Sequence, residues 1–163
     1  MFRRFLPCAL LALAIPAAAQ SVPATNYSDM WYLPSESGWG VSFLQHSGTN
    51  KVYAVWYTYD PREADAGVPG NFRPMWVVLA GGGTWTTPTT FTGPVYVTSG
   101  QPFNQGGSNT KVNPVGTFTF NFTDASNGTF TYNIAAPAGI PSTDPAFGLP
   151  AFSGTRNITR QSF

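Results

Sequence analysis

Charged residues are scarce in this chain of 163 residues, where they make up 9% of the sequence, against roughly 25% in an average globular domain. Eight Lys and Arg face seven Asp and Glu, and loss of Arg3 and Arg4 with a leader would leave six basic and seven acidic residues. This near-neutral balance excludes a charge-driven nucleic-acid binder. An apolar content of 42% also excludes a disordered polar tail.

Cysteine and histidine occur once each, as Cys8 and His46. Because Cys8 lies within an N-terminal segment that has the pattern of a leader, the rest of the chain has no thiolate chemistry, and no metal or cofactor is expected. His46 adjoins a predicted turn at Ser47 and Gly48. We expect it to be an exposed residue at a strand end, since no G-x-S-x-G nucleophile pattern accompanies it.

The first nineteen residues have the pattern of a cleaved signal peptide. Residues 1–4 form a short basic segment with Arg3 and Arg4, residues 5–15 form an apolar run, and residues 17–19 are three alanines typical of a cleavage site. The apolar run is shorter than the roughly 20 residues of a transmembrane helix. We therefore expect a signal peptide over 1–19, a single domain over 20–163, and export to a bacterial periplasm or to the medium.

Alternating hydrophobicity and turn residues predict about eight strands and no helix after the leader. The expected strands are residues 28–33, 38–46, 51–60, 73–79, 90–98, 115–123, 128–134 and 152–160. Three glycines at 81–83 predict a bend or bulge, because no Gly-Lys-Ser/Thr follows them as in a phosphate loop. Short connections favour an all-β antiparallel meander closed into an up-and-down β-barrel, with a two-sheet β-sandwich as the alternative.

The clearest alternation spans the predicted hairpin of residues 115–134. One face carries apolar side chains and the other carries Thr and Asn, as in a half-buried antiparallel sheet. The apolar set, expected to face the core, is Phe118, Phe120, Phe122, Phe130, Tyr132 and Ile134.

Two other predicted strands are apolar on both faces. In residues 51–60, Trp56 and Tyr57 point to opposite faces, and residues 73–79 behave in the same way. Something must cover the second face: a loop such as 135–151 or 61–71, a partner subunit, or a ligand.

Two carboxylates each border an aromatic strand: Glu36 precedes residues 38–46, and Asp60 ends residues 51–60. Glu36 and Asp60 have the ingredients of a glycosidase pair, which requires carboxyl groups about 5–10 Å apart beside sugar-stacking rings. Both also suit turn positions, where they would bind backbone amides. Asp60, Glu63 and Asp65 could collect a calcium ion, but the loop pattern of a calcium site is absent, which favours a surface charge cluster.

The N-terminal half carries sequence motifs of a recognisable kind. They are WYLPSESGWGV at 31–41, VWYTYD at 55–60 and PMW at 74–76. In these segments the chain resembles an uncharacterised family of exported bacterial all-β proteins with W-x-x-P-x-E-S-G-W-G, W-[FY]-T-Y-D and P-x-W motifs. The resemblance implies export and a β-rich module, and it implies no activity, ligand or catalytic residue.

Together these patterns predict an exported, non-enzymatic β-barrel module that binds a small or polymeric ligand, for example a saccharide, through an aromatic face. The expected ligand-binding residues are Trp39, Trp56, Trp76, Tyr57, Tyr59, Glu36 and Asp60. One alternative is a structural or protein-partner module of the cell envelope, such as an accessory domain or an inhibitor. A small outer-membrane barrel fits the leader and the strand count, but the Thr and Asn strand faces argue against it. A hydrolase using Glu36 and Asp60 is the remaining alternative.

Overall fold

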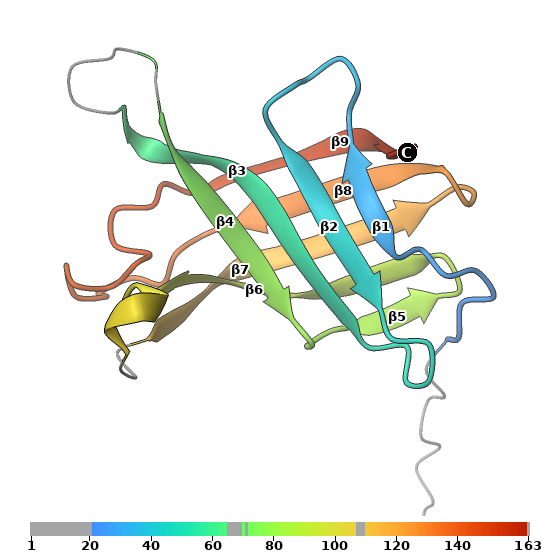
Figure 1. Ribbon diagram of the computed structural model, residues 1–163, viewed down its shortest axis with the longest axis horizontal. Helices are drawn as coiled ribbons and strands as arrows, with labels where there is room; N and C mark the ends of the chain where they lie inside the picture. Colours follow the sequence, from blue (N-terminus) through green and yellow to red (C-terminus); the bar gives the residue numbers. More distant parts are fainter. Residues whose placement is uncertain (1–20, 65–69, 71, 107–109, 163) are drawn as a thin grey trace, which may run out of the picture.

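The computed structural model describes residues 21–64, 70, 72–106 and 110–162. These residues form nine β-strands and one short 3-10 helix (Figure 1). The strands are β1 (Asp29–Tyr32), β2 (Gly40–Gln45), β3 (Val52–Ala64), β4 (Phe72–Ala80), β5 (Thr84–Thr87), β6 (Thr90–Ser99), β7 (Lys111–Phe122), β8 (Asn127–Ile134) and β9 (Phe152–Arg160), and the 3-10 helix is Phe103–Gln105.

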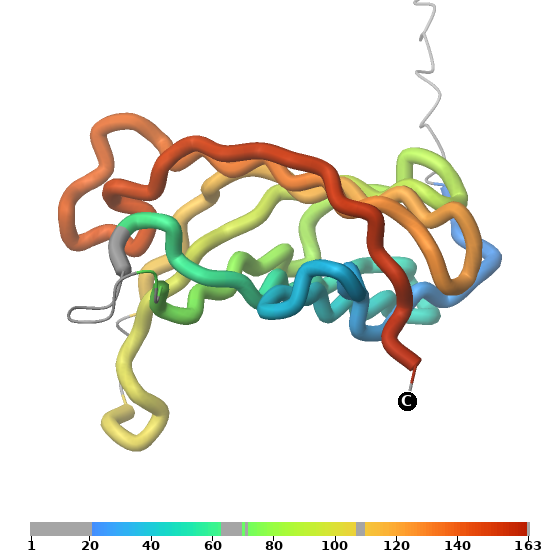
Figure 2. The backbone as a smooth tube through the Cα atoms, turned by 90° about the horizontal axis from the view of Figure 1, so that it is seen from above, coloured from blue at the N-terminus to red at the C-terminus, as the bar shows by residue number. Residues whose placement is uncertain are grey.

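Eight of the strands close into an antiparallel barrel. The order is β4-β3-β2-β1-β9-β8-β7-β6, with β4 pairing back onto β6 and with β5 added as an extra strand beside β6. Strands β1 to β4 form one wall and cross at an angle over β6 to β9, which form the other (Figure 1). Seen from above, the two walls enclose a flattened interior (Figure 2). The predicted up-and-down barrel is confirmed, and the sandwich alternative is wrong because the sheet closes on itself.

All eight predicted strands are present, with shifted ends. Strand β3 continues to Ala64, past the expected end at Asp60, and β7 starts at Lys111, before the expected start at Val115. Strand β5, which follows the glycines at 81–83, was not predicted.

Aromatic rings fill the interior of the barrel. In the hairpin of β7 and β8, five of the six predicted core residues are buried, and the sixth, Tyr132, is half-buried against Trp56. Rings from opposite walls meet across the interior, as Phe43 does with Phe120, their centroids 4.9 Å apart. The predicted inward face of this hairpin is therefore confirmed.

Segments outside the strands close both ends of the barrel. At one end Tyr27 stacks on Phe122, with ring centroids 3.9 Å apart. At the other end the connection between β8 and β9 contributes the buried Ala146 and Leu149 to the core. This connection, residues 135–151, loops beyond the barrel end in Figure 2. No helix in the described part of the chain is long and apolar enough to cross a membrane.

Candidate functional site

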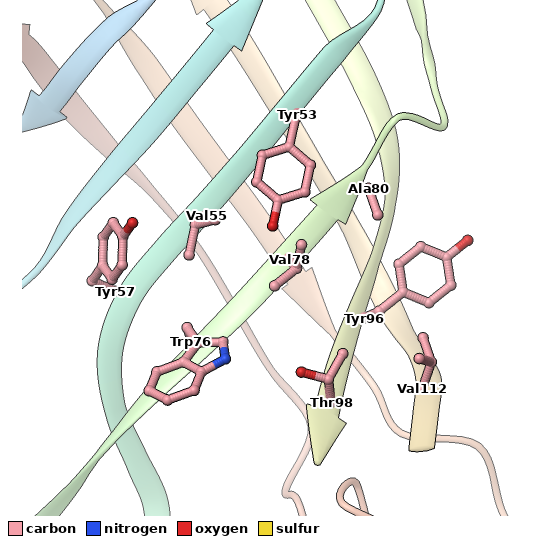
Figure 3. Close-up of a pocket in the computed structure, with 9 residues that line it drawn as sticks. All are labelled: Tyr53, Val55, Tyr57, Trp76, Val78, Ala80, Tyr96, Thr98 and Val112. Carbon is pink, nitrogen blue, oxygen red and sulfur yellow. The ribbon is translucent and has the colours of Figure 1, made fainter. Parts of the chain in front are cut away.

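A groove on the outside of the barrel is lined by aromatic and aliphatic side chains (Figure 3). We call it the outer groove, and its volume is about 570 Å³. Its lining consists of Tyr53, Val55, Tyr57, Trp76, Val78, Ala80, Tyr96, Thr98 and Val112. None of these nine side chains carries a charge at neutral pH, so the groove is an apolar surface with hydroxyl groups and one indole.

Strand alternation explains why the rings of the outer groove point away from the core. In β3, Ala54 and Trp56 are buried inside the barrel, so the residues between and beside them face outward. The pairing of β3 with β4 sets Tyr57 opposite Trp76 and Val55 opposite Val78. The aromatic side chains are therefore cross-strand neighbours above a valine floor.

These rings are accessible. Tyr53 is 45% exposed, Tyr57 46% and Trp76 54%, although most large apolar side chains of the chain are buried. On the far side of the groove, β4 pairs with β6 through the single residue pair Val78–Tyr96. The outer groove thus crosses the place where the barrel closes.

Two further hollows adjoin the outer groove on the same side of the barrel. One shares Tyr53 and Ala80 with it and reaches Leu44 on β2. The other shares Tyr57 with it and reaches Tyr32 on β1. The accessible surface therefore continues across neighbouring strands and is longer than the outer groove alone.

The connection 135–151 does not cover the outer groove. Arg62 Nη1 donates hydrogen bonds to the carbonyl oxygens of Pro145 (2.7 Å) and Phe147 (3.0 Å), and Lys111 Nζ donates to that of Thr143 (2.8 Å). These contacts hold the connection at the barrel end, and no residue of it lines the groove. Most of the other candidate cover, 61–71, lies outside the described residues.

A second, smaller hollow lies in the wall of the barrel. We call it the wall pocket, and its volume is about 140 Å³. It is lined by Glu36, Trp39, Trp56, Thr58, Phe130, Tyr132 and Arg156. These residues come from β3, β8, β9 and the connection between β1 and β2. The short β1 pairs with β9 only at Trp31–Arg160 and Tyr32–Thr159, so the rest of this side of β9 faces the wall pocket and that connection.

An ion pair forms the rim of the wall pocket. Glu36 Oε2 accepts hydrogen bonds from Trp39 Nε1 (3.1 Å) and from Arg156 Nε (3.0 Å). The hydrogen bond that Arg156 donates to Glu36 raises the pKa of the Arg156 guanidinium. Inside the rim, the ring of Trp56 stacks on that of Tyr132 at a centroid distance of 4.7 Å. The wall pocket therefore combines an apolar interior with a compensated pair of charges at its opening.

Asp60 lines neither the outer groove nor the wall pocket and is paired with Arg62. Arg62 Nε donates to Asp60 Oδ1 (2.8 Å) and Oδ2 (3.0 Å), and this hydrogen bonding lowers the pKa of the Asp60 carboxyl. Glu36 and Asp60, considered above as a glycosidase pair, each bind a different arginine. Their carboxylates are thus engaged in structural ion pairs.

The structure divides the predicted ligand-binding residues into two groups. Tyr57 and Trp76 line the outer groove, whereas Glu36, Trp39 and Trp56 line the wall pocket. Tyr59 is 50% exposed and its ring lies beside Gly38. Eleven of the residues that line these two sites were not predicted as ligand-binding, among them Tyr53, Tyr96, Tyr132 and Arg156. Alternation alone could have found Tyr53, which has the same parity as Tyr57.

Titratable side chains do not gather into a metal site in the described part of the chain. Those residues contain no group of three or more His, Cys, Asp or Glu placed to hold a metal ion. The side chains of Glu63 and Asp65, two of the three considered for calcium, lie outside the described residues. His46 is exposed, and its Nδ1 lies 3.2 Å from the backbone nitrogen of Thr49, which donates to it within the turn.

Comparison with known proteins identifies no relative of this chain. The resemblance in the motifs at 31–41, 55–60 and 74–76 therefore stays a prediction. No family model, no curated protein and no solved structure matches the chain.

Proposed function

We propose that this protein is an exported, non-enzymatic binding module that holds a neutral polysaccharide chain in the outer groove. The observation that carries the proposal is a groove that no described connection covers, in which Tyr53, Tyr57, Trp76 and Tyr96 surround two valines without any charged side chain. Contiguous exposed apolar patches on a protein surface commonly mark binding sites.

The chemistry of the lining favours a sugar ligand. Sugar rings present C–H groups on their faces, which pack on aromatic rings, and hydroxyl groups at their edges. The hydroxyls of Tyr53, Tyr96 and Thr98 and the indole N–H of Trp76 supply hydrogen-bonding partners for such edges. A charged polymer would find no complementary charge in the lining.

The length of the surface favours a polymer over a single sugar. Tyr53 and Tyr57 are four residues apart on one face of β3, which corresponds to about 13 Å. The two adjoining hollows extend the accessible surface in both directions. A ligand of several sugar units would contact more of this surface than a monosaccharide.

The outer face of the opposite wall is polar, as expected of a surface in contact with water. Outward-facing positions of β7 to β9 are occupied by Thr and Asn, among them Thr117, Asn121, Asn133 and Thr155, all exposed. A lipid-facing barrel would require an apolar band on this wall too. We therefore propose a module outside the membrane, in the periplasm or the medium.

Affinity electrophoresis in gels that contain neutral polysaccharides, such as cellulose-, xylan- and mannan-type polymers, tests the proposal. We expect at least one polymer to retard the protein and Trp76→Ala to weaken that binding by roughly 1 kcal/mol, the scale of one aromatic contact. Phe103→Ala is the matched control, because Phe103 is fully exposed and lies outside the groove.

Two results would contradict the proposal. One is that no neutral polymer retards the protein; the other is that Trp76→Ala and Phe103→Ala bind equally. Capture of an envelope protein that Trp76→Ala abolishes, with no polysaccharide binding, would instead favour the alternative of a protein-partner module.

A further inference from the structure

Two tyrosines on β3 divide the aromatic wall of the barrel into two parts. Tyr53 lines both the outer groove and the hollow that reaches Leu44, and Tyr57 lines both the outer groove and the hollow that reaches Tyr32. Tyr53, Val55 and Tyr57 follow one another along β3 (Figure 3). We call Tyr53 and Tyr57 the ridge, because the outer groove lies on one side of them and the two hollows extend on the other side toward β2 and β1.

The outer side of β2 continues the uncharged surface past the ridge. Val41 and Phe43 are fully buried in the barrel, so the residues that alternate with them face outward. Pairing of β2 with β3 and of β3 with β4 sets the outward residues in rows that contain no charged residue. The rows are Leu44–Tyr53–Ala80, Ser42–Val55–Val78 and Gly40–Tyr57–Trp76. We call the β2 members of these rows, Gly40, Ser42 and Leu44, the β2 face.

The β2 face is accessible and carries no ring of its own. Leu44 is 53% exposed, and Gly40 and Ser42 are small. The exposed Lys51 and His46 border the hollow near Leu44 from the turn between β2 and β3. A neutral guest on the β2 face would leave these two side chains hydrated at its edge and would lie against the ridge.

The combined surface is too broad for one sugar chain. Neighbouring strands lie about 4.8 Å apart, so β2 and β4 are separated by about 10 Å, while the ridge is about 13 Å long. A single chain that fills the outer groove covers only the β4 side of the ridge. The β2 face, with the exposed Leu44, would then remain in contact with water.

We propose that the ligand presents neutral sugar chains side by side, as the surface of an insoluble polysaccharide does, with one chain in the outer groove and its neighbour on the β2 face. This inference rests on the proposed function, since it takes the outer groove as a sugar site. Chains held in a solid bind together: once the first is bound, contact with the second is intramolecular and increases the overall affinity.

Pairs of solid and soluble probes test the proposal on the intact protein. Each solid is matched with a soluble oligosaccharide of the same sugar: microcrystalline cellulose with cellohexaose, crystalline mannan with mannohexaose, and chitin with chitohexaose. Depletion of the protein from solution measures binding to the solid, and titration followed by NMR measures binding to the oligosaccharide. For at least one pair we expect the solid to bind roughly tenfold or more tightly than the oligosaccharide.

Two variants separate the contributions of the two sides of the ridge. Leu44→Ser, on the β2 face, should weaken binding to the solid by roughly three- to tenfold and leave oligosaccharide binding unchanged, because only the second chain contacts Leu44. Trp76→Ala, in the outer groove, should weaken both. Phe103→Ala is the control and should change neither, because Phe103 lies outside both surfaces.

The outcomes distinguish this inference from the proposed function. Oligosaccharide binding that depends on Trp76, without tighter binding to the matching solid, would overturn the inference and leave the proposed function intact. Equal weakening of solid and oligosaccharide by Leu44→Ser would also overturn it, since one chain would then cover both sides of the ridge. If no solid and no oligosaccharide binds through Trp76, the proposed function fails and the inference fails with it.

Discussion

At the residue scale, the hairpin of β7 and β8 shows how far the alternation of apolar and polar residues along a strand determines which side chains are buried. Phe120 is fully buried among rings of both walls, whereas Thr117 on the same strand is exposed. We expect Phe120→Ala to lower the free energy of unfolding by about 3–5 kcal/mol through lost burial and the cavity left behind. Thr117→Ala should change it by less than roughly 0.5 kcal/mol. Chemical denaturation measures both, and similar midpoints for the two variants would contradict the register.

The same alternation could not choose the inner face of β3. Trp56 and Tyr57 are both large and aromatic, so their sequence predicts only that they point to opposite faces. The choice is made by distant partners: Trp56 packs against Phe118, Phe130 and Tyr132, and these contacts exist only in the closed barrel. For this reason the predicted ligand-binding residues separate into two sites that the sequence did not distinguish.

The ion pair between Arg62 and Asp60 makes a contribution to the free energy of unfolding that depends on pH. The hydrogen bonds from Arg62 hold the pKa of Asp60 below its ordinary value of 3.8. Because the folded-state pKa is lowered, the stabilisation is complete above the ordinary value and is lost as the pH falls through the folded-state pKa. We expect Asp60→Asn to be less stable than the parent protein at neutral pH by roughly 1 kcal/mol.

The test of this pair is a set of urea denaturation curves at several pH values. The difference in the free energy of unfolding between the parent protein and Asp60→Asn should be constant near neutrality and should disappear below pH 3.8. A gap that is the same at every pH would show that Asp60 contributes through something other than its charge.

At the scale of elements, a bulge and a glycine shape the pairing of β6, β7 and β8. The register of β6 on β7 shifts between Val95 and Tyr96, opposite Gly116, whose φ is 145°. A Cβ on Gly116 would collide with the backbone carbonyl of Asn133 on β8. We expect Gly116→Ala to lower the free energy of unfolding by about 2–4 kcal/mol, from backbone strain and overlap.

Gly100→Ala is the matched control for this prediction. A Cβ there would meet the Thr110 side chain at an ordinary 3.5 Å, and the backbone does not require a positive φ. Thermal unfolding followed by circular dichroism compares the two variants. Equal unfolding temperatures would show that the glycine at the bulge is not required.

Strand existence could be predicted better than strand ends or the extra strand. Eight strands had enough alternating residues to be predicted, but β5 has only four residues and follows three glycines, which locally favour a bend. Its stability comes from pairing with β6 and from burial of Trp85, neither of which is a local property. The extension of β3 past Pro61 likewise depends on pairing with Phe72 across a register shift.

At the scale of the whole molecule, closure of the barrel separates two surfaces of different chemistry. Short connections predicted a meander, but closure requires β1 to pair with β9 and β4 to pair with β6, contacts between residues far apart in the chain. Once closed, the barrel has Thr and Asn on the outside of one wall and exposed aromatic rings on the outside of the other. The proposed function makes the aromatic wall the ligand-binding surface.

Mapping of backbone amide chemical shifts during titration with neutral oligosaccharides of several units tests this assignment most directly. We expect saturable shifts concentrated at Tyr53, Tyr57, Trp76 and Tyr96, with little change at Thr155 on the opposite wall. Shifts concentrated on the Thr and Asn wall, or no saturable shift with any neutral oligosaccharide, would contradict it.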